Sequence, residues 1–170
     1  TNKGEFQTIT AYNPADDEDS SELVGRPYEA VPGTPDAVIV DIDGTIALMQ
    51  SGRNPYDYTR VHEDSPNTQV VNLVQRLSRD SVEIVYASGR SDECRDQTQQ
   101  WIDTHVGVSG PLFMRKSGDY RKDSIVKLEI FDREIRDNYN VLFMLDDRRQ
   151  VTEMYRSLGL TVLQVDFGEF

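Results

Sequence analysis

Cysteine, long apolar segments and positive charge are all scarce in this sequence. The 170 residues include one cysteine, Cys94, which excludes an intrachain disulfide and suits a reducing compartment such as the cytoplasm. The longest apolar segments, AVIV at 37–40 and VLFML at 141–145, are far too short to cross a bilayer. We therefore expect no membrane segment and no signal peptide.

The shortage of positive charge bears on the partners that the protein can have. The chain has 18 Lys and Arg against 30 Asp and Glu, for a net charge of -12, which by itself argues against a nucleic-acid partner. Half of this excess lies in residues 1–36, which hold two basic and eight acidic residues. The stretch RKSGDYRK at 115–122 has four basic residues and one acidic residue. A phosphate-bearing partner therefore stays open.

The first 36 residues differ in composition from the rest of the chain. They contain the acidic stretch ADDEDSSE at 15–22 and four of the seven prolines. Sequence of this kind, poor in apolar residues, is typical of a solvated tail or linker. The alternative is a boundary with a neighbouring domain. We expect a single folded domain over residues 37–170.

Strand-like and helix-like patterns alternate from residue 37 onward. Short apolar segments typical of buried strands occur at 37–41, 82–87, 112–114, 141–145 and 161–165. Apolar residues recur with helical spacing in four segments between or after them, at 70–77, 94–105, 125–135 and 151–158. Residues 50–66 are expected to form a loop. The alternation predicts an α/β fold, with helices on both faces of a parallel sheet.

Polar and charged residues gather where the predicted strands end. Because parallel strands end at one edge of a sheet, where ligands bind, we expect these side chains to converge there. They are Asp41 and Asp43 after the first strand, Ser88, Gly89 and Arg90 after the second, Lys122 before the third helix, and Asp146 and Asp147 after the fourth strand.

Converging carboxylates repel one another and need a compensating cation. Mg²⁺ prefers oxygen ligands and keeps room for waters and a phosphate oxygen, so we assign it to Asp41, the backbone carbonyl of Asp43, and Asp146. Lys122 and Arg90 are suited to phosphate oxygens, as a point charge and a bidentate fork respectively. Hydrogen bonds from Ser88 and from backbone amides of the segment after Asp41, where Gly44 and Thr45 lie, complete a phosphate site.

The two aspartates of VIVDIDGT have separate roles in this interpretation. Asp41 attacks phosphorus and carries an aspartyl-phosphate, and Asp43 protonates the leaving oxygen and then activates water. Neighbouring carboxyls favour such a division, because one of the two is readily kept protonated. Gly44 permits the tight turn, and Thr45 caps or orients the loop.

The motifs VIVDIDGT at 38–45, ASGR at 87–90, Lys122 and LDD at 145–147 occur in the order found in haloacid-dehalogenase (HAD) phosphatases. The sequence resembles that family over about residues 37–167, which implies a HAD-like Rossmannoid fold. In the family, the first aspartate of the pair is the nucleophile and the second is the general acid and base.

A narrower resemblance involves GRNPYD at 52–57, SGR at 88–90, YRKDSIVKLEIF at 120–131 and LDDRRQVTEMYRSLG at 145–159. These segments are similar to the 3′-phosphatase domain of phage-type polynucleotide kinase–phosphatase. The resemblance implies Mg²⁺-dependent removal of 3′-phosphates from nucleic-acid ends, and opening of 2′,3′-cyclic phosphates. It further implies that Arg53 and Arg90 contact substrate or phosphate and that Asp147 supports the metal. The setting would be the cytoplasm, that of the host if the source is viral.

In that family a P-loop kinase domain precedes the phosphatase. This sequence has no G-x-x-x-x-G-K-[ST], so we expect no kinase activity from this chain. Two alternative functions stay open: a HAD phosphatase for small-molecule or nucleotide phosphates, and a non-catalytic module that binds nucleic-acid ends. The short segment between Thr45 and the first helix leaves room for a small cap or none, which favours a polymeric substrate.

Overall fold

A five-stranded parallel sheet forms the centre of the structure, a computed structural model that describes residues 25–49, 54 and 57–168. The strand order across the sheet is β5-β4-β1-β6-β7. The strands are β1 Asp36–Val40, β4 Glu83–Ser91, β5 Leu112–Arg115, β6 Asn140–Arg148 and β7 Val162–Gly168. The predicted α/β class with a parallel sheet is therefore confirmed.

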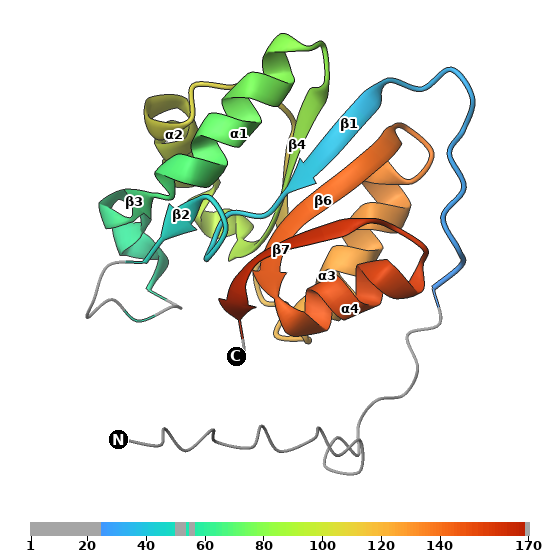
Figure 1. Ribbon diagram of the computed structural model, residues 1–170. Helices are drawn as coiled ribbons and strands as arrows, with labels where there is room; N and C mark the ends of the chain where they lie inside the picture. Colours follow the sequence, from blue (N-terminus) through green and yellow to red (C-terminus); the bar gives the residue numbers. More distant parts are fainter. Residues whose placement is uncertain (1–24, 50–53, 55–56, 169–170) are drawn as a thin grey trace, which may run out of the picture.

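Helices cover both faces of this sheet (Figure 1). Helices α1 (Thr68–Arg79) and α2 (Arg95–His105) lie on one face, and α3 (Asp123–Ile130) and α4 (Arg149–Ser157) on the other. Each layer has its own apolar core against the sheet: Val74 and Ile102 belong to one, Val126 and Tyr155 to the other. The apolar stripes read from the sequence are the faces that these helices bury.

Strand β1 lies in the middle of the sheet, which explains its unbroken apolar sequence. Residues 37–40 are buried because helices cover the strand on both sides. Val40 pairs with Tyr86 of β4 and with Leu145 of β6. The next residue, Asp41, donates its backbone N–H to the Leu145 carbonyl at 2.9 Å. The register therefore carries Asp41 to the carboxyl edge, beside the ends of both neighbouring strands.

The segment between β1 and α1 contains more structure than the predicted loop. Strand β2 (Ala47–Leu48) pairs antiparallel with β3 (Ser65–Pro66), and a 3₁₀ helix, η2 (Tyr58–Glu63), precedes β3. These short elements stand at the carboxyl edge of the large sheet (Figure 1). They form a small cap in the described part of this segment, as the sequence analysis expected.

Two further short helices adjoin the long ones. Ser91 accepts a hydrogen bond from the Glu93 N–H and caps η3 (Asp92–Cys94), a 3₁₀ turn that leads into α2. The π-helical turn η4 (Phe131–Ile135) continues α3. Among the described residues, no helix is long and apolar enough to cross a membrane.

Residues 25–35, part of the predicted tail, run along the α3 and α4 side of the domain (Figure 1). The Tyr28 N–H donates to the Leu158 carbonyl, and the Tyr28 hydroxyl donates to the Tyr139 carbonyl. The Tyr28 ring packs edge-on against Phe131, with ring centroids 5.8 Å apart. This part of the segment therefore contacts the domain, although it has no regular secondary structure.

Candidate active site

Asp41, Asp146 and Asp147 form a buried cluster of carboxylates at the ends of β1 and β6. Each offers one oxygen such that the three oxygens lie within 4.8 Å of one another. None of the three residues is more than 6% exposed, so water screens their charges poorly. The structure thus brings together three of the four aspartates that the sequence analysis expected to converge at this edge of the sheet.

One lysine of α3 lies among these carboxylates. The Lys127 ammonium is 2.7 Å from an oxygen of Asp41, 2.7 Å from one of Asp146 and 3.7 Å from one of Asp123. Burial opposes its charge, but the carboxylates, Asp146 foremost, outweigh burial and raise the Lys127 pKa above its usual range. Lys127 is therefore a charged, buried partner of the cluster.

The lysine beside the carboxylates is thus Lys127. The sequence analysis had named Lys122 instead. Lys122 is exposed and is the N-cap residue of α3. Lys127 is a buried residue inside the helix, one turn after Asp123. The phosphate contact of Lys122 stays a prediction, and the lysine that the structure places among the carboxylates comes from the same segment of the chain.

Asp43 is not one of these three clustered carboxylates, and its side chain binds Arg90. The Arg90 Nε donates to one Asp43 oxygen at 2.8 Å, and Nη2 donates to the other at 2.7 Å. Nη2 also donates to buried Asp64 at 2.8 Å, and the Asp64 carbonyl accepts the Trp101 indole N–H at 2.8 Å. Asp64, which the sequence analysis missed, therefore anchors the arginine that orients Asp43.

These contacts bear on the predicted phosphate contact of Arg90. Arginine has five N–H donors, and four of those on Arg90 are used, the fourth by the Thr98 hydroxyl at 3.3 Å. The residue is 1% exposed. Its bidentate fork faces Asp43, which supports a positioning role for Arg90, and one of its five N–H donors has no acceptor among the described residues.

Two glycines of the site stand where any side chain would collide. A Cβ on Gly44, whose φ is +78°, would lie 2.2 Å from an Asp147 oxygen. A Cβ on Gly89 would lie 2.2 Å from an Asp123 oxygen. Both glycines therefore permit close approach of backbone to a carboxylate, and Gly44 also adopts a left-handed conformation that suits glycine.

The remaining predicted residues are placed as follows. Ser88 is fully buried, and its hydroxyl accepts the Arg90 backbone N–H at 3.2 Å. The Thr45 hydroxyl lies 3.5 Å from an Asp41 oxygen and 3.4 Å from an Asp147 oxygen, so it bridges the cluster with long hydrogen bonds. Arg53 lies outside the described residues.

The carboxylate cluster fits a hard divalent cation such as Mg²⁺. Its donors are oxygens, and they come from three rigid positions at the ends of two strands. Burial raises the pKa of Asp41, of Asp146 and of Asp147, the last to about 6, so the fold disfavours three negative charges there. A cation bound between the oxygens would remove this cost.

These pKa shifts predict how the stability of the metal-free protein depends on pH. Burial, followed by the Asp146 charge, raises the Asp147 pKa to about 6, whereas an unfolded aspartate titrates near 3.9. Between these values the folded state binds more protons, so the free energy of unfolding should fall as pH rises, by at most about 3 kcal/mol from this group. Chemical denaturation in EDTA from pH 4 to 7 measures the fall.

Asp147→Asn supplies the comparison for that titration. The variant cannot ionise at this position, so its stability should fall less than that of the wild type over the same pH range. Parallel curves for the two proteins would show that Asp147 has an ordinary pKa in the fold.

A second prediction concerns Asp64. Asp64→Ala should leave Arg90 with one carboxylate partner and free it to shift, which misorients Asp43. We expect kcat to fall by roughly 10²-fold, the lower end for acid–base catalysis, with little change in KM. Removal of a buried ionic partner should also destabilise the domain, by about 3 kcal/mol. Steady-state kinetics and thermal unfolding measure the two effects.

Asp103→Ala is the matched control, because Asp103 is an exposed aspartate whose side chain accepts a hydrogen bond from Gln99. It should behave as wild type in both assays. A normal kcat in folded Asp64→Ala would remove the positioning role from Asp64.

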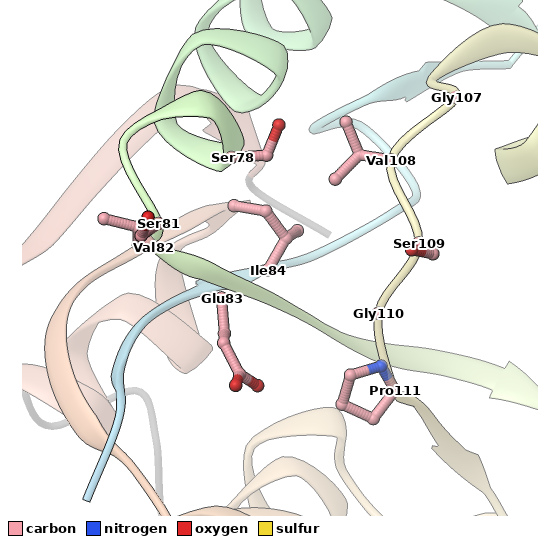
Figure 2. Close-up of a pocket in the computed structure, with 10 residues that line it drawn as sticks. All are labelled: Ser78, Ser81, Val82, Glu83, Ile84, Gly107, Val108, Ser109, Gly110 and Pro111. Carbon is pink, nitrogen blue, oxygen red and sulfur yellow. The ribbon is translucent and has the colours of Figure 1, made fainter.

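A surface hollow of about 470 Å³ lies at the other end of the sheet (Figure 2). Glu83 and Ile84, at the start of β4, line one side, and residues 107–111 line the other. Its one ionisable side chain is Glu83, and the carboxylate cluster lies at the opposite end of the strands. The hollow therefore lacks the clustered carboxylates and the buried lysine that lie at the other end of the sheet.

A known protein family matches most of this chain. Residues 35–170 match the model described as "Polynucleotide kinase PNKP phosphatase domain". A protein of Autographa californica nuclear polyhedrosis virus, "Putative bifunctional polynucleotide kinase/RNA ligase", is 41% identical over 143 residues, which are 80% of this chain and 20% of that protein.

Solved structures show the same likeness. A chain in the "Pnkp1/Rnl/Hen1 RNA repair complex" matches with a TM-score of 0.80 at 37% identity, over 84% of this chain and 46% of that one. A chain in a second structure of the Pnkp1/Rnl/Hen1 complex gives 0.79 at 36%, over 88% and 52%. A "putative had-like phosphatase" from Mesorhizobium loti gives 0.51 at 16%, over 80% and 73%, which shows the fold alone. This chain thus spans about a fifth of the viral relative and half of the two Pnkp1-complex chains.

Proposed function

Because this chain belongs to the family of polynucleotide kinase PNKP phosphatase domains, we propose that it is a Mg²⁺-dependent polynucleotide 3′-phosphatase. It removes the terminal phosphate from the 3′ end of a nucleic acid through an aspartyl-phosphate on Asp41. One observation carries the proposal. At the carboxyl edge of β1, the carboxylates of Asp41, Asp146 and Asp147 lie together, and the Lys127 ammonium contacts two of them.

Asp41 is the nucleophile in this proposal. One of its oxygens attacks phosphorus, a new O–P bond forms, and the bond from phosphorus to the 3′ oxygen breaks. Lys127, 2.7 Å from Asp41, keeps the attacking carboxylate in place and offsets negative charge beside it. Mg²⁺, held by Asp41, Asp146 and Asp147, would supply Lewis-acid polarisation of the phosphoryl oxygens.

Asp43 is the general acid and the general base in this proposal. Its carboxyl group gives a proton to the leaving 3′ oxygen in the first step, and the resulting carboxylate takes a proton from water in the second. That water attacks phosphorus and releases inorganic phosphate, which restores Asp41. The two hydrogen bonds from Arg90 fix the orientation of Asp43, and the half-exposed side chain of Asp43 can reach both the leaving group and water.

Three predicted residues complete the phosphate site in the proposal. The backbone at Gly44 and the Thr45 hydroxyl border the carboxylates, and the buried Ser88 hydroxyl lies near the carboxyl end of β4. Because Gly89 has no side chain, the end of β4 lies close to Asp123, and Asp123 in turn pairs with Lys127. We retain Arg53 as a substrate contact on the family resemblance alone.

The size of the cap supports a polymeric substrate over a small one. In the described residues, the insertion between β1 and α1 contributes only β2, β3 and η2. In this proposal, a cap of this size leaves room at the carboxyl edge for a strand of nucleic acid. The Pnkp1 structures come from an RNA repair complex, which favours end repair as the setting, in the cytoplasm of the cell or host.

A panel of phosphorylated substrates tests the proposal. The chain is incubated with Mg²⁺ and oligonucleotides that carry a 3′-phosphate, a 5′-phosphate or a 2′,3′-cyclic phosphate, and with a nucleoside 3′-monophosphate. We expect phosphate release from the 3′-phosphate end, slower release from the cyclic end, and loss of both in EDTA. Release from the mononucleotide alone would favour a small-molecule phosphatase, and binding without release would favour a non-catalytic end-binding module.

The relation to a kinase is a further part of the proposal. The viral relative is described as a kinase and ligase, and this chain matches a fifth of it. We propose that the phosphatase acts together with such end-modifying activities. The kinase chemistry itself is not assigned to these 170 residues, which lack a P-loop motif.

A further inference from the structure

Tyr120 is the most exposed of the large apolar and aromatic side chains in the described part of the chain, at 95%. It lies in the loop of residues 116–122, between β5 and α3. Single exposed apolar side chains are common and by themselves need no function. What distinguishes this ring is the backbone that carries it and the place where that backbone is attached.

The backbone on both sides of Tyr120 is fixed by one arginine. The Arg115 Nη1 donates to the Asp119 carbonyl at 3.1 Å and to the Arg121 carbonyl at 2.8 Å. The ring therefore projects into water from a loop that is tied down before and after it. A ring on a fixed backbone loses little conformational freedom when a flat ligand stacks on it.

The same arginine attaches this loop to the active site. The Arg115 Nε donates to the Gly89 carbonyl at 2.8 Å, and Nη2 donates to Asp123 at 3.0 Å. Asp123 is in turn ion-paired with Lys127, which contacts Asp41. The loop thus stands at the rim of the site, on the side of the edge strand β5.

The basic side chains of the loop are paired with acidic ones, so the Tyr120 ring is its more available group for binding. The Arg121 guanidinium donates to Asp119 and to Glu129, and the Lys116 ammonium lies 3.3 Å from Asp92. These basic side chains of the stretch RKSGDYRK already have acidic partners. They offer less attraction to a phosphate backbone than the sequence analysis expected.

We infer that Tyr120 is a stacking platform for an unpaired base of the nucleic acid whose 3′-phosphate lies at Asp41. This inference rests on the proposed function, since it needs a substrate that carries bases beyond the terminal nucleotide. A base stacked on an aromatic ring is held through its π-face, which all bases share. The platform therefore selects for single-stranded ends over small phosphates without reading sequence.

Binding of a labelled oligonucleotide tests the inference without turnover. A fluorescent single strand with a 3′-phosphate is titrated with protein in EDTA, and the anisotropy gives Kd. Tyr120→Ala should raise Kd roughly tenfold, a typical effect for the loss of one stacked base. Tyr120→Trp and Tyr120→Phe should bind as wild type. The same oligonucleotide with abasic sites upstream of its last nucleotide should bind wild type and Tyr120→Ala equally.

The salt dependence and a matched variant complete the design. The tenfold effect should be the same at low and high salt, because stacking releases no counterions from phosphates. Phe167→Ala removes a ring that is 89% exposed on the opposite edge strand, β7, and should leave Kd unchanged. An unchanged Kd in Tyr120→Ala, an equal loss with the abasic strand, or an equal loss in Phe167→Ala would overturn the inference.

The kinetic form of the experiment separates this inference from the proposed function. With Mg²⁺ and a 3′-phosphorylated strand, Tyr120→Ala should raise KM about tenfold at unchanged kcat. If wild type releases no phosphate, the proposed function fails, while the anisotropy titration still decides whether Tyr120 binds a base.

Discussion

Asp41→Asn should abolish phosphate release while the domain stays folded. An amide cannot attack phosphorus, so we expect kcat to fall by roughly 10⁴-fold or more. Stability should not fall with it, because burial raises the Asp41 pKa and the fold therefore favours the neutral form of this side chain. Release of inorganic phosphate from a 3′-phosphorylated oligonucleotide and thermal unfolding measure the two properties.

Asp36→Asn is the control for that variant, because Asp36 is an exposed aspartate at the amino end of the same strand. It should keep wild-type turnover. A folded Asp41→Asn protein that still releases phosphate would take the nucleophile assignment away from Asp41. A lower melting temperature would show instead that the charged form of Asp41 stabilises the fold.

Lys127→Met should be costly for both stability and activity. The substitution keeps the bulk and apolar stem of the side chain but leaves Asp41, Asp146 and Asp123 without their shared cation. Removal of one partner of a buried ion pair costs about 3–5 kcal/mol. We expect a correspondingly lower free energy of unfolding in EDTA, partial recovery with Mg²⁺, and at least a 10²-fold lower kcat for the folded fraction.

Lys122→Met makes the same chemical change five residues earlier. Because Lys122 is exposed at the start of α3, its loss should change stability by less than about 0.5 kcal/mol and leave kcat within a few-fold of wild type. Equal effects in the two variants, or a larger effect in Lys122→Met, would contradict the assignment of the buried lysine.

The fold was predictable because its strands and helices leave simple patterns. The β1 sequence AVIV is apolar throughout because helices cover both faces, and residues 70, 71, 74 and 77 lie on the buried side of α1. The ends of β4 and β6 were less predictable. Polar residues at 88–91 and 146–148 continue these strands, although composition alone suggests that the strands have ended.

The sequence analysis missed Lys127 because it considered the basic loop before α3 and not the helix itself. Lys127 lies one turn after Asp123 and four residues before Phe131, within the apolar stripe of α3 and η4. A charged residue inside such a stripe signals a buried partner of opposite charge. The helical period, applied to YRKDSIVKLEIF, could have identified Lys127.

The role of Arg90 depends on contacts that no local pattern encodes. Its partners Asp43 and Asp64 lie 47 and 26 residues away in the chain. The motif SGR gives no sign that a carboxylate from the cap segment will occupy one side of the guanidinium. Asp64 itself follows η2, in the region predicted only as a loop, so its burial could not be anticipated from its surroundings in the sequence.

The most direct test of the account is to trap the phosphorylated protein. Asp43→Asn protein should form the intermediate more slowly than wild type, because it cannot protonate the leaving oxygen. It should hydrolyse the intermediate more slowly still, because no carboxylate activates water at that position. It is mixed with Mg²⁺ and a 3′-phosphorylated oligonucleotide, quenched in acid and digested for mass spectrometry. We expect one added phosphoryl group on the peptide that contains Asp41. Phosphate release with no labelled peptide, or a phosphoryl group on another residue, would contradict it.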